Sequence, residues 1–139
     1  MQITFESDSV NFILGSFNAL QFGTYSMIKL FGVPSCNKIR DAKVILESNN
    51  IEYQFINVKK TPIPEKQLKE IIKQLGMEKV LNKQGLTYKK LGLKQMNLNN
   101  TQQLQWLLKE QSMIKRPLLE NNGHYLIDSE ESTILAFCR

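Results

Sequence analysis

The sequence predicts a single α/β domain, in which a βαβ unit is followed by helices and then by a ββα unit. Two observations carry this prediction. Apolar runs of strand length alternate with segments of helical period, and proline, glycine and asparagine stand at the breaks between them. The chain has 139 residues, of which 42% are hydrophobic and 22% charged. This length and composition suit one domain with one hydrophobic core.

The first unit is a βαβ. Residues 28–33 form an apolar run that predicts a short buried strand. Residues 37–48 place apolar side chains on one stripe of a helix that ends at Asn49-Asn50. Residues 53–58 then predict a second strand. Strands joined by a crossover helix are expected to be parallel.

The middle of the chain is predicted to be helical. Pro64 suits the first turn of a helix whose apolar residues recur at helical spacing as far as Leu75, and Gly76 is a natural stop. Residues 77–81 predict a further helical turn, residues 87–91 are ambiguous, and residues 101–111 predict a helix.

The last unit is a ββα. Asn121-Asn122-Gly123 is a turn signal between two apolar runs and predicts a β-hairpin. Asp128 or Ser129 then resembles the start of a final helix that runs to Phe137. The complete order is that of a thioredoxin-like fold with a helical insertion between its two halves.

Residues 1–26 differ from the rest of the chain. They hold several aromatic and aliphatic side chains but no cation and no sustained period, and they match neither a secretory signal nor a membrane span. We interpret them as an N-terminal extension that is disordered or upstream of a natural start at Met27, with the domain in residues 27–139. The alternative is an extra element packed on the core.

Charge and cysteine content indicate which partners and which cellular compartment the protein is suited to. All 18 Lys and Arg lie beyond residue 28, so the domain is basic and could attract a polyanion or a small anion. We favour the interpretation that most of these lysines are solvated on the polar faces of helices. We expect a monomer that binds neither nucleic acid directly nor a membrane. Cys36 and Cys138 give no disulfide framework, which predicts a reduced, cytoplasmic compartment.

Cys36 is the strongest candidate for a reactive residue. Pro34-Ser35 ends the first strand, and Cys36 stands where the next helix begins. Unpaired backbone N–H groups and the helix dipole favour the nucleophilic thiolate there, and Lys38 and Arg40 add positive charge. The alternative is a small buried hydrophobe, as most free cysteines are.

Three segments carry a resemblance to a known family. They are Ser35-Cys36-Asn37, then Leu81-Asn82-Lys83-Gln84-Gly85 with Tyr88-Lys89-Lys90-Leu91, and last Ile114-Lys115-Arg116-Pro117. Their order and spacing resemble the arsenate reductase-like (ArsC/Spx) family, and within it the small bacterial YffB-like subgroup. The resemblance covers Met27 to about Leu135.

The resemblance implies a site. Cys36 would be the nucleophile, Arg116 the arginine that binds an anion, and Pro117 a cis proline beside which backbone groups pair with glutathione. We expect Asn37 and Lys38 to assist binding next to Cys36. Glutathione would be a co-substrate, with no bound cofactor. The sequence has no metal-ligand spacing, glycine-rich phosphate loop or Ser/His/Asp constellation.

Departures from the family pattern narrow the function. Asn82 and Asp128 stand where the glutaredoxin-linked arsenate reductases carry arginines, so arsenate is expected to be a poor substrate. Ile39 replaces the second cysteine of a C-x-x-C switch. The sequence therefore predicts a glutathione-dependent monothiol reductase. The alternative is an Spx-like regulatory protein that binds RNA polymerase without a local C-x-x-C switch.

Overall fold

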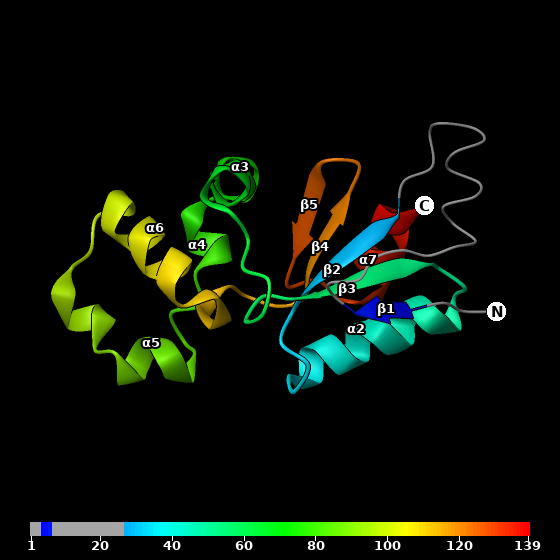
Figure 1. The fold of residues 1–139 in the computed structure, drawn as a ribbon, viewed down its shortest axis with the longest axis horizontal. Helices are drawn as coiled ribbons and strands as arrows, with labels where there is room; N and C mark the ends of the chain where they lie inside the picture. Colours follow the sequence, from blue (N-terminus) through cyan, green and yellow to red (C-terminus); the bar gives the residue numbers. More distant parts are fainter. Residues whose placement is uncertain (1–3, 7–26) are drawn as a thin grey trace.

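The computed structural model describes residues 4–6 and 27–139 of the chain (Figure 1). The elements in residues 27–139 follow the predicted order, and a further strand precedes them. The elements are β1 (Thr4–Glu6), β2 (Ile28–Gly32), α2 (Asn37–Ser48), β3 (Tyr53–Asn57), α3 (Glu65–Leu75), α4 (Met77–Val80), α5 (Leu86–Lys90), the 3₁₀ helix η2 (Leu93–Met96), α6 (Asn100–Lys109), the 3₁₀ helix η3 (Gln111–Met113), β4 (Leu118–Asn121), β5 (His124–Ile127) and α7 (Glu131–Cys138).

The strands form one sheet in the order β1-β3-β2-β4-β5. β3 runs parallel to β2, as predicted for a βαβ unit, and β4 is antiparallel to both β2 and β5. Asn122 and Gly123 have φ values of 54° and 80° in the β4–β5 hairpin. Two consecutive positive φ values suit the right-handed twist of the flanking strands, and asparagine and glycine tolerate them best. The thioredoxin-like βαβ and ββα halves are both confirmed.

Residues 4–6 lie inside the segment that we interpreted as an extension. They form β1, which pairs in parallel with β3 at the edge of the sheet. Residues 4–6 thus add an edge strand to the sheet. The other residues of the segment lie outside those that the structure describes, and a natural start at Met27 stays a prediction.

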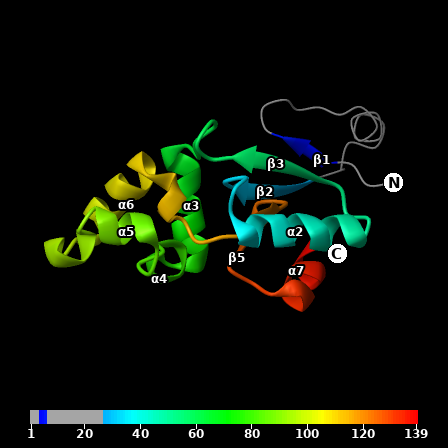
Figure 2. The same ribbon diagram turned by 90° about the horizontal axis from the view of Figure 1, so that it is seen from below.

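Two hydrophobic cores flank the sheet. On one face α2 and α7 lie side by side (Figure 2). We call their core the α2-side core; it includes Leu30, Ile39, Ala42, Leu46, Phe55, Leu119 and Ile134. The helical insertion, residues 65–113, extends away from these helices (Figure 1). Its core, the insertion-side core, includes Phe31, Val33, Leu68, Ile71, Leu107, Leu118 and Ile127.

On strands β2 and β4, neighbouring residues belong to different cores. Leu30 and Phe31 divide between them on β2, and Leu118 and Leu119 divide on β4. Successive side chains of a strand point to opposite faces, so the sheet is a wall shared by the two cores. No helix in the described part of the chain is long and apolar enough to cross a membrane.

Two local assignments differ from or refine the predictions. The ambiguous segment around residue 88 is the short helix α5. The last helix begins at Glu131, so its predicted start at Asp128 or Ser129 is wrong. The N–H of Asp128 donates to the Pro117 carbonyl at 2.9 Å, and Asp128 has a φ of 49°. A left-handed residue cannot continue a right-handed helix, so α7 starts beyond this turn.

Candidate functional site

Cys36 occupies the N-cap position of α2. Its backbone is extended, with a φ of −80° and a ψ of 131°, and its carbonyl accepts the N–H groups of Ile39 and Arg40 at 3.1 Å each. The side chain makes no capping hydrogen bond and is half-buried. The thiol therefore stands at the positive end of a 12-residue helix with part of its surface open to a reactant.

The end of β2 is shaped to support this cysteine. A methyl group at Gly32 would lie 2.3 Å from Cδ1 of Ile39, so only glycine leaves room for that fully buried side chain. The same methyl would lie 3.8 Å from Cδ of Arg116. Ile39 on the first turn of α2 and the stem of Arg116 therefore approach the same point at the end of β2. Cys36 itself packs partly against both cores.

The Arg116–Pro117 peptide bond is cis, as the family resemblance implied. Pro117 is buried, and Arg116 is half-buried. Nη1 of Arg116 donates to the carbonyl of Ser112 at 3.3 Å. Within the described part of the chain, the main-chain N–H and C=O of Arg116 make no hydrogen bond. Both groups therefore lack a hydrogen-bond partner among the described residues.

A short two-stranded contact precedes Arg116 in the chain. Leu81 and Ile114 form an isolated antiparallel bridge. Its hydrogen bonds run from the N–H of Asn82 to Met113 and from the N–H of Lys115 to Val80, at 2.8 Å each. The second and third segments that carry the family resemblance thus lie side by side, and the bridge joins the middle of the insertion to the segment that follows its end.

Lys38 and Asn37 make contacts of their own near Cys36. Nζ of Lys38 lies 2.8 Å from Oδ1 of Asp128, and both side chains are exposed. The side chain of Asn37 accepts a hydrogen bond from Arg40. Lys38 and Pro117 line one cavity of about 370 Å³ with Asp128, whereas Arg116 lines another of about 100 Å³ with Asn82. Three of the predicted binding residues therefore divide between two cavities, and Asn37 lines neither of them.

Cys138 has a different environment. It is half-buried at the end of α7 and packs against the α2-side core. Burial raises the pKa of its thiol from 9.0 to about 11. In both views the C terminus lies away from the N-terminal end of α2, where Cys36 stands (Figures 1 and 2). The described residues include no group of three or more His, Cys, Asp or Glu side chains placed to hold a metal ion.

Sequence reasoning missed two features of this region. It treated Lys38 as a solvated or ligand-binding charge. In the structure Lys38 instead pairs with Asp128, which lies 90 positions further along the chain. It also missed the buried amides of Gln103 and Gln111 in the insertion. Glutamine at an inward helix position is the available signal, but it does not reveal which backbone group or ligand the amide meets.

Comparison with known proteins agrees with this geometry. The model of the ArsC family matches residues 31–137, which include Cys36, the insertion and the cis proline. The chain belongs to the ArsC family.

Relatives of this ArsC-family chain carry two different descriptions. An arsenate reductase of Neisseria meningitidis serogroup A is 31% identical over 69% of this chain and 85% of its own. The global transcriptional regulator Spx of Streptococcus mutans is 26% identical over 80% of this chain and 82% of its own. The solved structure of a YffB protein superimposes with a TM-score of 0.75 and 27% identity, and it covers 81% of this chain and 100% of that one.

Proposed function

We propose that this ArsC-family protein is a glutathione-dependent monothiol reductase with Cys36 as its nucleophile. The observation that carries the proposal is the half-exposed thiol at the start of α2, with a buried isoleucine at position 39. A disulfide formed on Cys36 then has no local cysteine to resolve it. An external thiol must do so.

The proposed reaction is a pair of thiol–disulfide exchanges. The Cys36 thiolate attacks the glutathione sulfur of a mixed disulfide, and the substrate leaves as a thiolate that takes a proton from water. A second glutathione thiolate then attacks the glutathione sulfur bound to Cys36. Glutathione disulfide leaves, and the Cys36 thiolate returns. Each cycle thus consumes one reduced glutathione, releases the substrate thiol and transfers the disulfide bond to glutathione disulfide.

The surroundings of Cys36 support glutathione as the co-substrate. The free main-chain N–H and C=O of Arg116, next to the cis proline, can pair with an extended peptide in the manner of an added strand. The guanidinium of Arg116 offers further donors to a carboxylate. We propose that Lys38 and Asn37 assist from the first turn of α2, and that the protein acts as a cytoplasmic monomer without a bound cofactor.

Arsenate fits this site poorly. Asp128 stands where the resemblance places an arginine. Its carboxylate forms an ion pair with Lys38 and so offsets the positive charge of that lysine. Asn82, the other replacement, accepts a hydrogen bond from the N–H of Gln84 at 3.1 Å and supplies no charge. One arginine with a nearby carboxylate attracts a multiply charged oxyanion weakly.

The test compares the two cysteines as matched variants. Reduction of a small disulfide is followed through glutathione, glutathione reductase and NADPH consumption. We expect Cys36→Ser to abolish the enzyme-dependent rate and Cys138→Ser to keep a rate close to that of the wild type. Full activity in Cys36→Ser, or no activity in the wild type with folding intact, contradicts the proposal.

A second candidate is a regulatory protein that binds RNA polymerase. The likeness to Spx over 80% of the chain supports it. Without a second cysteine near Cys36, such binding would be independent of a local redox switch. Retention of purified bacterial RNA polymerase by both the wild type and Cys36→Ser supports this candidate, and failure of both to retain it contradicts it.

A further inference from the structure

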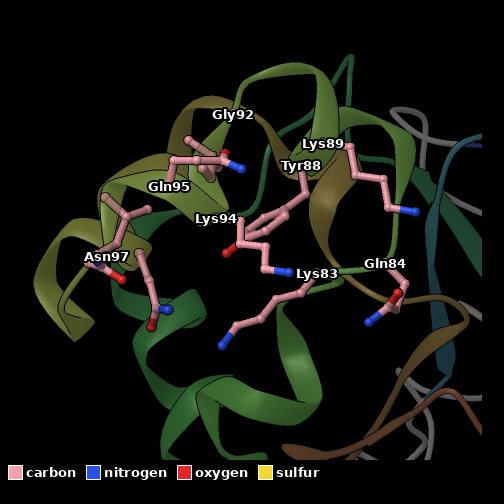
Figure 3. A pocket seen from close by; sticks show the side chains of 11 residues that line it. Lys83, Gln84, Tyr88, Lys89, Gly92, Lys94, Gln95 and Asn97 are labelled. Carbon is pink, nitrogen blue, oxygen red and sulfur yellow. The ribbon is translucent and has the colours of Figure 1, made fainter.

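The helical insertion contains a cavity that is separate from the thiol site. Its volume is about 550 Å³, and its walls come from the loop after α4, from α5, from η2 and the residues that follow it, and from α6 (Figure 3). None of its lining residues belongs to the Cys36 loop or to the Arg116–Pro117 segment. This volume lies in the range of small-molecule sites.

The cavity has a positive lining. Lys83, Lys89 and Lys94 contribute to its wall, and no carboxylate does. Lys83 lies 3.2 Å from an oxygen of the highly exposed Glu78, whereas Lys89 and Lys94 make no ion pair within the described part of the chain. In Figure 3 the side chains of Lys83 and Lys94 extend into the same opening. From residue 81 to residue 109 the sequence has five lysines and no acidic residue. The net field at the cavity therefore favours an anion.

Two buried polar side chains face the same cavity without partners. Gln103 is 9% exposed and Tyr88 is 7% exposed, and both line it. Neither the amide of Gln103 nor the hydroxyl of Tyr88 makes a hydrogen bond to any described residue. The other buried glutamine differs, because both amide atoms of Gln111 bond to the backbone of Ile63. The polar atoms of Gln103 and Tyr88 are open to the cavity, where a ligand can replace water as their hydrogen-bond partner.

We propose that this cavity binds a small phosphate ester that carries hydroxyl groups, of the class of sugar phosphates. Lysine ammonium groups bind phosphate as point charges, and Lys83 and Lys94 stand at the opening. The Gln103 amide and the Tyr88 hydroxyl can each both donate and accept, as sugar hydroxyls do. The phosphate binds at the lysines, and the uncharged part of the ligand extends to the buried pair. The site does not depend on the chemistry of Cys36.

Calorimetric titration of the full chain tests the proposal, with ribose 5-phosphate as the probe and with ribose, inorganic phosphate and adenosine 5′-monophosphate as comparisons. We expect ribose 5-phosphate to bind, ribose alone to fail, and inorganic phosphate to bind more weakly. Tighter binding of adenosine 5′-monophosphate also supports a phosphate ester and assigns the remaining volume to a base. Absence of binding by both esters overturns the proposal.

Variants separate the cavity from general surface charge. Lys94→Gln and Gln103→Leu are each expected to weaken binding by about tenfold, because each removes a bond to the ligand. Lys90→Gln is the matched control, since Lys90 is exposed on the same helix as Lys89 but does not line the cavity. Equal weakening by Lys90→Gln and Lys94→Gln overturns the proposal. Melting temperatures check that each variant is folded. If Gln103→Leu unfolds, Lys94→Gln still tests the proposal, because Lys94 is exposed and its replacement should not disturb the fold.

Discussion

At the scale of single residues, position alone separates the two cysteines. Cys36 meets the unpaired N–H groups at the start of α2, whereas Cys138 packs against the α2-side core at the end of α7. Burial raises the pKa of the Cys138 thiol, whereas Cys36 keeps part of its surface open at the start of a helix. A thiol that stays protonated at neutral pH is a poor nucleophile. The structure therefore favours Cys36 for the proposed exchange.

The raised pKa of Cys138 predicts a pH dependence of stability. The folded protein holds the proton of this thiol up to a pKa of about 11, whereas the unfolded chain releases it near 9.0. The unfolded state thus binds fewer protons between about pH 9 and 11, and the free energy of unfolding falls as pH rises through that window. Cys138→Ala is expected to reduce this fall, as measured by urea denaturation across the range.

Tyr125 also contributes to the fall in the free energy of unfolding at alkaline pH. Burial raises its pKa above 10.0, against the opposing effect of its hydrogen bond with Gln67. A shallower alkaline fall therefore persists in Cys138→Ala. An unchanged slope in the variant would show that ionisation of Cys138 is not coupled to folding.

The sequence predicts the residues of the site better than their partners. Cys36 at a helix start follows from a strand break next to an amphipathic helix, and the cis bond at Pro117 follows from the resemblance. The pairing of Lys38 with Asp128 does not follow, because it depends on how α2 sits against the turn after β5. Long-range side-chain contacts have no local signal.

At the scale of elements, a side chain clamps the insertion to the chain that enters it. Gln111 in η3 accepts the N–H of Ile63 at 2.8 Å and donates to its carbonyl at 2.9 Å. Ile63 precedes α3 and is 3% exposed. Gln111 is itself buried, so these two bonds replace water for both residues.

Removal of this clamp is expected to destabilise the protein. Gln111→Leu leaves the N–H and C=O of Ile63 buried without partners, and the free energy of unfolding should fall by about 2–4 kcal/mol. Gln105→Leu on the exposed face of α6 is the matched control and should change it by less than about 0.5 kcal/mol. Urea denaturation measures both. A loss below about 1 kcal/mol in Gln111→Leu would mean that water reaches these groups.

Periodic elements are predictable, and elements set by context are not. The apolar stripe of α3 and the Asn122-Gly123 turn of the hairpin are local patterns, and both were confirmed. α5 has only five residues and no period of its own. β1 is set by its pairing with the edge of β3, and the start of α7 by the bond from Asp128 to Pro117.

At the scale of the whole molecule, the sheet joins the two cores. β2 and β4 each supply neighbouring residues to both, and Cys36 packs partly against both. The bridge between Leu81 and Ile114 ties the middle of the insertion to the segment that leads to Arg116. The thiol site is therefore held in place only when the sheet, α2 and the insertion are folded together. We expect the described domain to unfold as one cooperative unit.

Trp106 allows a test of that cooperativity. It is the single tryptophan of the chain and packs, partly buried, against the insertion-side core. Leu119→Ala removes a fully buried side chain from the α2-side core, so the free energy of unfolding should fall by about 2–5 kcal/mol.

With one cooperative unit, the midpoints seen by Trp106 fluorescence and by far-ultraviolet circular dichroism fall together in urea, although the substitution lies on the far face of the sheet. Leu107→Ala in the insertion-side core serves as the matched control and should shift both probes likewise. A tryptophan midpoint that stays at the wild-type value in Leu119→Ala, while the dichroism midpoint falls, would show that the insertion folds separately. The approach of Arg116 to Gly32 and the Cys36 loop would then be a docking equilibrium rather than a fixed feature of the fold.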